Sequence, residues 1–445
     1  MLFRQFVDDD LGCASYLIGD PDAGIAVLVD PAYAIEPYLE AADEERVRII
    51  RALETHTHAD HVSGHGRLAL DHDVAVLINP LAEPDYPFEP LDDGRELDLG
   101  HVTIRAVHTP GHRPEHTALV VLADGEPRHV LTGDSLFVGS VARPDLAVEA
   151  REGAEGMFRS LRRLLELPDA VEVDPGHVAG SLCGAGMSGA PSSTIASERA
   201  SNPFLALLDD EHRFVAETVG TAGIRPPNVE RIVALNRGPF VSAPEPLDEL
   251  GSADGAVVLD VRDPEAFARG HVPGAINVPL GVSRFATKAG FVLCDGDRIA
   301  IHATSDADAD RAARALRAVG FLELAGRLAE PETSEHVEPV DIDELERLLA
   351  GGGARVVDVR EKDERDDGYI AGSMHMPYRL LRACGEDLAA GDAPVVTICE
   401  SGERAGIAAS VLAHEGVNAR PVLGGGIPDW QARGGRMVEF RRCGS

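Results

Sequence analysis

Three histidines and one aspartate lie within the six residues His56 to His61. Imidazole nitrogens and carboxylate oxygens are the ligands that zinc and non-haem iron prefer. The apolar run from Val47 to Leu53 comes just before them and predicts a buried strand. A loop at the end of that strand can direct these side chains to one point, so the stretch predicts a metal site. The alternative is a histidine-rich surface loop.

Three later motifs place single metal-binding side chains beside glycine or proline. They are Thr109-Pro110-Gly111-His112, Thr132-Gly133-Asp134 and Asp174-Pro175-Gly176-His177. Each follows a predicted strand, over 102–107, 129–131 and 170–173, where the backbone must turn sharply. This order of strand-end motifs indicates one shared site.

We predict that His116 is a surface histidine or one with satisfied hydrogen bonds.

A second reactive group lies near the end of the chain. Cys399-Glu400-Ser401-Gly402-Glu403-Arg404 follows the predicted strand Val395 to Ile398 and precedes a predicted helix. Backbone N–H groups at a helix N-terminus stabilise a thiolate and its persulfide. The pattern therefore predicts a nucleophilic cysteine, and a structural cysteine is the alternative.

Several domains are needed to hold these two groups. A chain of 445 residues is too long for one ordinary core, so we expect two to four domains. In the first part, short predicted strands alternate with helical segments over 35–47, 64–70 and 195–219. The proline-rich residues 236–246 predict a boundary.

The last 200 residues contain an internal duplication. Val258 to Arg262 recurs as Val356 to Arg360, and a Gly-rich segment after each copy recurs at the same offset. Repeats of this length are whole domains. Alignment of the copies places Ala303 where the second copy has Cys399, so we predict that the first copy is catalytically inactive.

Composition excludes several classes of partner. The net charge of −34 argues against binding to nucleic acid or to an anionic membrane. The N-terminus has no basic segment followed by an apolar one, and no apolar run is long enough to span a bilayer. The six cysteines form no C-x-x-C pair, which predicts a reducing, cytoplasmic compartment. We expect a homo-oligomer, either a dimer or a tetramer.

The histidine and aspartate motifs together resemble the metallo-β-lactamase superfamily over residues 1–235. The resemblance implies an αββα sandwich with its metal between two sheets. The repeats resemble rhodanese domains, inactive over 245–335 and active over 336–445. The expected fold class is thus a multidomain α/β protein with parallel sheets in the two C-terminal domains.

One branch of this superfamily fits best. Residues 132–137, Thr-Gly-Asp-Ser-Leu-Phe, resemble both glyoxalase II and persulfide dioxygenases, whereas residues 139–146 resemble the dioxygenases. Residues 177–193 resemble dioxygenases that are fused to rhodanese domains. One departure is that Val178-Ala179 replace a tyrosine of the stand-alone dioxygenases, so no role of that tyrosine is transferred.

This resemblance implies one Fe(II) per chain, held by His56, His112 and Asp134. A thiol persulfide would react with O2 there to give sulfite. The remaining residues of the motifs would orient water and the iron ligands; they are His58, Asp60, His61 and His177. Arg143 would meet an anionic group of the substrate, and a structural salt bridge to Asp145 is its alternative. Cys183 is predicted as a small buried thiol, or as a thiol near the metal.

The rhodanese resemblance makes Cys399 the sulfur acceptor and Arg404 its partner in catalysis. The substrate-binding loop would comprise Glu400, Ser401, Gly402 and Glu403, with sulfite and thiosulfate as small-molecule partners. Its two glutamates make it acidic for a site that receives anions. Two alternatives remain: a two-zinc thioester hydrolase of glyoxalase II type with accessory rhodanese domains, and a sulfur-relay or interaction module.

Overall fold

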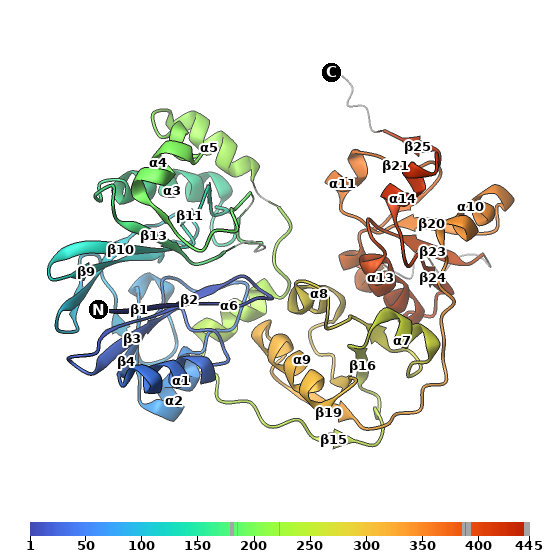
Figure 1. Ribbon diagram of the computed structural model, residues 1–445, viewed down its shortest axis with the longest axis horizontal. Helices are drawn as coiled ribbons and strands as arrows, with labels where there is room; N and C mark the ends of the chain where they lie inside the picture. The colour runs from blue at the N-terminus through green and yellow to red at the C-terminus, as the bar shows by residue number, and fades with distance from the viewer. Residues whose placement is uncertain (179–181, 185, 222, 385–387, 389–392, 440–445) are drawn as a thin grey trace. The chain divides into compact units, whose positions relative to one another are not determined.

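The computed structural model describes residues 1–178, 182–184, 186–221, 223–384, 388 and 393–439. Ala179, named above, lies outside them. The chain forms two compact units, residues 1–244 with 317–320, and residues 245–316 with 321–445 (Figure 1). Residue 235, the predicted end of the first domain, falls within helix α6 (Val229–Arg237), so the helix continues past that position.

The first unit contains two six-stranded sheets. The first, in the order given, comprises β1 (Leu2–Val7), β2 (Ala14–Asp20), β3 (Ile25–Val29), β4 (Arg48–Leu53), β5 (Ala75–Ile78) and β6 (Glu89–Pro90). The second runs β14 (Ser193–Thr194), β13 (Glu172–Pro175), β10 (Glu126–Gly133), β9 (Thr117–Ala123), β8 (Val102–His108) and β7 (Glu96–Asp98). A two-stranded sheet pairs β11 (Leu136–Phe137) with β12 (Ser140–Val141).

Helices cover the outer faces of both sheets. Those beside the first sheet are α1 (Glu36–Glu45) and α2 (His65–His72), and those beside the second are α3 (Ala150–Leu164), α4 (Ile195–Ser201) and α5 (Glu211–Gly220) (Figure 1). One 3-10 turn, η1 (Pro80–Ala82), follows β5. Helix, sheet, sheet and helix therefore form the predicted αββα sandwich, and the predicted fold class is confirmed.

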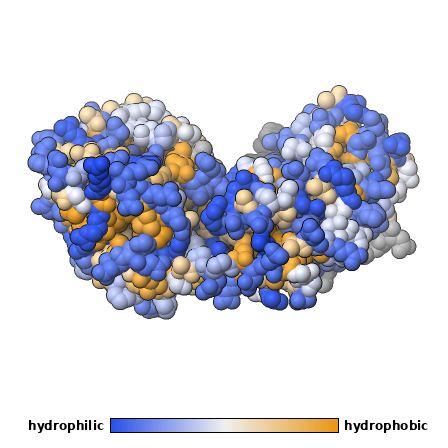
Figure 2. Space-filling view, turned by 60° about the horizontal axis from the view of Figure 1, so that its bottom comes forward, coloured by the Kyte–Doolittle hydropathy of each residue, from blue (hydrophilic) through white to orange (hydrophobic). Residues whose placement is uncertain are grey.

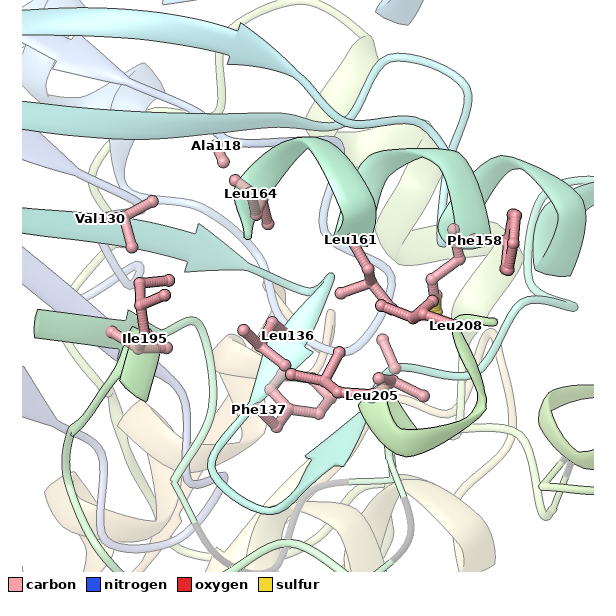
Figure 3. Packing of buried hydrophobic residues seen from close by; sticks show 14 of the residues in the cluster. Ala118, Val130, Leu136, Phe137, Phe158, Leu161, Leu164, Ile195, Leu205 and Leu208 are labelled. Carbon is pink, nitrogen blue, oxygen red and sulfur yellow. The ribbon is translucent and has the colours of Figure 1, made fainter. Parts of the chain in front are cut away.

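Apolar side chains fill both the space between the sheets and the space under the helices. Every residue of β2 is buried, as expected for a strand that is covered on both faces. Figure 3 shows the cluster under α3, which joins sheet, helix and loop residues. Its labelled members are Ala118, Val130, Leu136, Phe137, Phe158, Leu161, Leu164, Ile195, Leu205 and Leu208. This packing holds the strand ends in place.

The prediction of one helical stretch over 195–219 was wrong. Helix α4 ends at Ser201, a 3-10 turn η2 (Leu205–Leu207) follows, and α5 begins at Glu211. Pro203 disfavours helical backbone at the residue before it, and Asn202 has ψ 118°. The sequence therefore contained the signal for this break.

The second unit contains a separate sheet for each repeat. The first copy has the order β15 (Glu249–Leu250), β19 (Leu324–Leu328), β18 (Ile299–His302), β16 (Val257–Asp260) and β17 (Ile276–Asn277). The second has the order β22 (Met374–His375), β20 (Arg355–Asp358), β23 (Val395–Ile398) and β24 (Ala419–Pro421), and β21 (Tyr369–Ile370) pairs with β25 (Met437–Val438). All pairings within the two larger sheets are parallel, as predicted.

Helices flank these parallel sheets. Those of the first copy are α7 (Pro264–Arg269), α8 (Phe285–Val292) and α9 (Asp306–Ala318). Those of the second are α10 (Ile342–Gly351), α11 (Lys362–Asp366), η3 (Tyr378–Leu380), α12 (Leu381–Cys384), α13 (Glu403–His414) and α14 (Ile427–Ala432).

Strand register gives a position-by-position match between the copies. Asp260 of β16 pairs with His302 of β18, and Asp358 of β20 pairs with Ile398 of β23. The next residues are Ala303 in the first copy and Cys399 in the second. The register therefore places an alanine at the position of the predicted nucleophile.

No helix among the described residues combines the length and the apolar character needed to cross a bilayer. Figure 2 shows one face of the molecule, on which hydrophilic residues predominate and hydrophobic residues form separate small groups.

Candidate metal centre and sulfur-transfer loop

The three predicted metal ligands and His177, a predicted neighbour of the metal, lie just beyond the ends of strands. His56 follows β4, His112 follows β8, Asp134 follows β10 and His177 follows β13. All four side chains are buried. Because β4 belongs to the first sheet and the other strands to the second, the two halves of the sandwich bring these residues together.

His56, His112 and Asp134 form one potential metal-binding group. Their ligand atoms all lie within 4.8 Å of one another. The Asp134 Oδ2 atom is 3.6 Å from His112 Nε2 and 4.0 Å from His56 Nε2. Neither Asp134 Oδ2 nor His112 Nε2 has a hydrogen-bond partner among the described residues. A buried unpaired polar atom costs about 1–3 kcal/mol, and a bound cation removes that cost, so the group fits a metal ion.

Hydrogen bonds fix which nitrogen of each imidazole faces this point. The Thr55 hydroxyl donates to Asp30 at 2.8 Å, so it accepts from His56 Nδ1 at 2.9 Å. His112 Nδ1 donates to the Arg143 carbonyl oxygen at 2.9 Å. Both rings therefore hold their proton on Nδ1 and leave the Nε2 lone pair for a metal.

Protonation states in this group match those of metal ligands. Burial lowers the pKa of His112 and of His56, which keeps both imidazoles neutral. Burial alone would raise the pKa of Asp134, but the nearby His177 holds it at about 2. Two neutral imidazoles and one carboxylate are what metal binding requires.

A second group consists of His58, Asp60 and His61, whose ligand atoms also lie within 4.8 Å of one another. Carboxylates already face two imidazoles at this group: His58, which is a member, and His177, which bonds to Asp60. His177 donates to Asp134 at 2.8 Å and to Asp60 at 2.7 Å, and these carboxylates raise its pKa to about 10 against the effect of burial. An imidazolium offers no lone pair to a metal.

His58 is held in the same way by two residues that sequence reasoning missed. Its Nε2 atom lies 3.3 Å from Asp30 and 3.2 Å from Glu54, and both carboxylates raise its pKa although burial opposes them. His58 and His65 in turn hold the pKa of Glu54 at about 2, although burial would raise it. Asp30 directly follows β3 and Glu54 directly follows β4, and this position at a strand end is the signal that could have identified them.

His116 contradicts its prediction as a surface or satisfied histidine. It is fully buried, and its ring centroid is 5.2 Å from that of His56. Its Nδ1 atom bonds Thr109 at 2.8 Å, but its Nε2 atom has no partner in the described part of the chain. Burial lowers its pKa to about 3, so the ring is neutral. It follows the predicted ligand His112 by four residues, which is a weak local signal.

Arg143 forms the salt bridge that was its alternative. Its guanidinium binds Asp145 at 2.7 and 2.9 Å and also donates to the carbonyl oxygens of Gly223 and Ile224. This arrangement favours a structural role for the side chain. Cys183 is buried in the core. Its sulfur also lies within 4.8 Å of ligand atoms of Asp60 and His177, so the thiol borders the second group at Asp60.

The Cys399 loop connects β23 to α13 and buries the cysteine completely. The Gly402 N–H donates to Cys399 Sγ at 3.1 Å, as predicted for a loop that stabilises a thiolate. Gly402 has φ 96°, a conformation that glycine adopts without strain. Ser401 is exposed beside it.

Charged partners surround this loop. Glu400 lies 3.5 Å from Arg360, and Arg404 binds Glu364 through two bonds of 2.6 Å that raise the pKa of the guanidinium. A cavity of about 390 Å³ adjoins the loop and includes Arg360, Glu364 and Glu400 in its lining. Polar and charged groups therefore border this cavity.

Replacing Gly426 with alanine should destabilise the second repeat. A Cβ atom there would lie 2.0 Å from the Glu400 carbonyl oxygen, and Ile427 donates to the Cys399 carbonyl oxygen at 3.0 Å. We expect a loss of about 3 kcal/mol in the free energy of unfolding. Urea denaturation followed by Trp430 fluorescence measures it, because this is the single tryptophan of the chain.

Gly406→Ala in α13 is the matched control for Gly426→Ala. Its added Cβ would make only an ordinary contact, 3.6 Å from the Leu423 side chain, so we expect little or no loss of stability. Equal unfolding curves for the two alanine variants would contradict the close packing of Gly426 against the loop.

Both parts of the chain are similar to known protein families. A model of the metallo-beta-lactamase superfamily matches residues 8–177, and a model of the rhodanese-like domain matches residues 243–329 and 341–433. A hydroxyacylglutathione hydrolase of Methylococcus capsulatus is 31% identical over 252 residues, which cover 50% of this chain and 91% of that protein. The chain belongs to the metallo-beta-lactamase superfamily. Its C-terminal part consists of rhodanese-like domains, so the predicted architecture is confirmed.

Two further similarities extend this comparison. The mitochondrial persulfide dioxygenase ETHE1 of Bos taurus is 29% identical over 217 residues, which cover 47% of this chain and 78% of that protein. The crystal structure of a metallo-beta-lactamase from Staphylococcus aureus has a TM-score of 0.68 and 27% identity, and covers 74% of this chain and 99% of its own. Similarity to that structure therefore continues beyond the metallo-beta-lactamase match.

Proposed function

We propose that this superfamily member is a persulfide dioxygenase with an attached sulfurtransferase. The single observation that supports this most is the group His56, His112 and Asp134, in which two neutral imidazoles and one carboxylate converge. Two histidines and one carboxylate on one face of iron(II) leave open positions for other ligands. We expect one iron(II) per chain.

When bound, iron(II) would supply a place for dioxygen and the terminal sulfur of a persulfide to react. The balanced reaction is RSSH + O2 + H2O → RSH + SO3²⁻ + 2H⁺, in which one sulfur is oxidised and dioxygen is reduced. His177 holds Asp134 through a 2.8 Å hydrogen bond and thereby directs its other oxygen towards the two imidazoles. Burial of the group keeps bulk water away from it.

Cys399 would perform the second step. Its thiolate attacks the outer sulfur of a thiol persulfide, the S–S bond of that persulfide breaks, and the thiol leaves as Cys399 becomes a persulfide. Sulfite then attacks the outer sulfur of the Cys399 persulfide. The S–S bond to Cys399 breaks, a new S–S bond forms, and the products are thiosulfate and the free thiolate. The Gly402 N–H, 3.1 Å from Sγ, stabilises the negative charge that the thiolate carries before and after transfer.

Oxygen consumption tests the dioxygenase directly. The full-length protein loaded with iron(II) should consume O2 in the presence of glutathione persulfide and form one sulfite per O2, counted as free sulfite plus thiosulfate. An oxygen electrode and sulfite analysis measure both quantities. Coenzyme A persulfide provides a second carrier for comparison. Loaded protein that consumes no O2 with either persulfide would refute this function.

A second candidate is a two-zinc thioester hydrolase. The group His58, Asp60 and His61 favours it, as does the similarity to a hydroxyacylglutathione hydrolase. In that enzyme class a metal-held hydroxide attacks the substrate. Hydrolysis of S-lactoylglutathione by protein containing two zincs would support this candidate. The carboxylates that face His58 and His177 support the single-iron proposal instead.

A further inference from the structure

Helix α8 of the inactive rhodanese copy packs against the active copy. Its Lys288 ammonium bonds the Glu403 carboxylate, which lies in the Cys399 loop. Nearby, the ring of Phe291 meets that of Tyr378 edge-on, with centroids 6.2 Å apart. Both contacts lie within the second compact unit. The copy without a nucleophile therefore contacts the loop of the copy that has one.

Lys288 is an unusual side chain in this protein. The chain contains two lysines, Lys288 and Lys362, and arginine provides every other strong positive charge. The Lys288 side chain is 11% exposed, whereas that of Lys362 is 73% exposed. A buried ammonium needs partners, and Lys288 finds them in the Ser283 carbonyl oxygen at 2.7 Å and in Glu403. These two contacts therefore hold the Lys288 ammonium beside Glu403.

Two arginines near the loop are engaged by other carboxylates. Arg404, the arginine of the loop motif, binds Glu364 with both terminal nitrogens, and Arg360 binds Asp358 while facing Glu400. Glu403 in turn forms an ion pair with Lys288. Removal of that ammonium would leave a partly exposed carboxylate beside Cys399, which would repel anions.

We propose that Lys288 is a positioning residue for the Cys399 site, supplied by the inactive copy. It holds and neutralises the Glu403 carboxylate, so that anionic sulfur compounds such as sulfite and thiosulfate can approach the cysteine. This role rests on the proposed sulfurtransferase function. The inactive copy is then a required part of the active site rather than a spacer.

Charge-selective alkylation tests this role without requiring turnover. Iodoacetate is an anion and iodoacetamide is neutral, so the ratio of their rates at Cys399 reports anion access. Peptide mass spectrometry resolves Cys399 from the other cysteines of the full-length protein. We expect Lys288→Met to lower the iodoacetate-to-iodoacetamide ratio by about threefold to tenfold, since it removes one nearby positive charge.

Two further variants complete this experiment. Lys362→Met removes the other lysine, which pairs with Asp366 on the surface, and should leave the ratio unchanged. Lys288→Met combined with Glu403→Gln removes both charges and should restore the ratio. Glu403→Gln alone should raise it, which keeps the test informative if Lys288→Met does not fold. Trp430 fluorescence checks folding of the active copy in each variant.

Steady-state kinetics link this access to function. For thiosulfate as sulfur donor, Lys288→Met should raise KM by the same threefold to tenfold with kcat changed less than about twofold. An unchanged alkylation ratio in folded Lys288→Met, or no recovery in the double variant, would overturn the inference. If the ratio responds but wild-type protein transfers no sulfur, the proposed sulfurtransferase function fails while the role of Lys288 in anion access stands.

Discussion

Replacing Cys399 with serine is expected to abolish thiosulfate formation while oxygen consumption stays close to the wild-type rate. A hydroxyl cannot form a persulfide, so the transfer step loses its sulfur carrier. The loop should keep its shape, because its glycine backbone and the Arg404–Glu364 pair do not depend on the sulfur. Sulfite should therefore accumulate in place of thiosulfate.

Separation of sulfite and thiosulfate by chromatography after bimane labelling measures this outcome. The persulfide substrate is added with O2, and both products are followed over time. Cys294→Ser is the matched control, because Cys294 is an exposed cysteine of the inactive copy, before its loop. Its product distribution should equal that of wild type. Thiosulfate formed enzymatically by the Cys399→Ser variant would show that sulfur transfer uses another group.

Local patterns predicted the residue types of both sites and the layers that hold them. His112 and Asp134 were identifiable because each follows a strand beside glycine, where few side chains of that type occur by chance. In the structure β9 lies antiparallel between β8 and β10, so these two strands run in the same direction and end at the same edge of the sheet. Pro203 lies within the predicted helix over 195–219 and marks the place where that helix is interrupted.

Long-range partners could not be predicted in the same way. Glu403 and Lys288 are 115 residues apart, and their pairing depends on how one repeat packs on the other. The sequence showed an acidic loop, and only the fold supplies the cation that offsets it. Likewise, the proton positions of His58 and His177 depend on carboxylates from other strands. Sequence spacing alone could not distinguish ligands from charged neighbours.

Replacing His112 with alanine is expected to remove most of the bound metal and to lower oxygen consumption by about a thousandfold. The substitution deletes one of three proposed ligands and leaves Asp134 Oδ2 with a single imidazole partner. His61→Ala should behave differently under the single-iron proposal. It removes the hydrogen bond between His61 and Asp60. Loss of a residue that only orients the metal site lowers metal affinity by about 10- to 100-fold.

Metal content by inductively coupled plasma mass spectrometry, measured on separate samples saturated with iron(II) or with zinc, separates the two proposals. With one iron per chain, His61→Ala should still bind about one metal, because His56, His112 and Asp134 remain intact. In a two-zinc site the same variant should lose one of two metals, since His61 would itself be a ligand. His101→Ala, which removes an exposed imidazole, should change neither metal content nor oxygen consumption. Loss of half the bound metal in His61→Ala would therefore favour the hydrolase, because it would show that His61 is itself a ligand of a second metal ion.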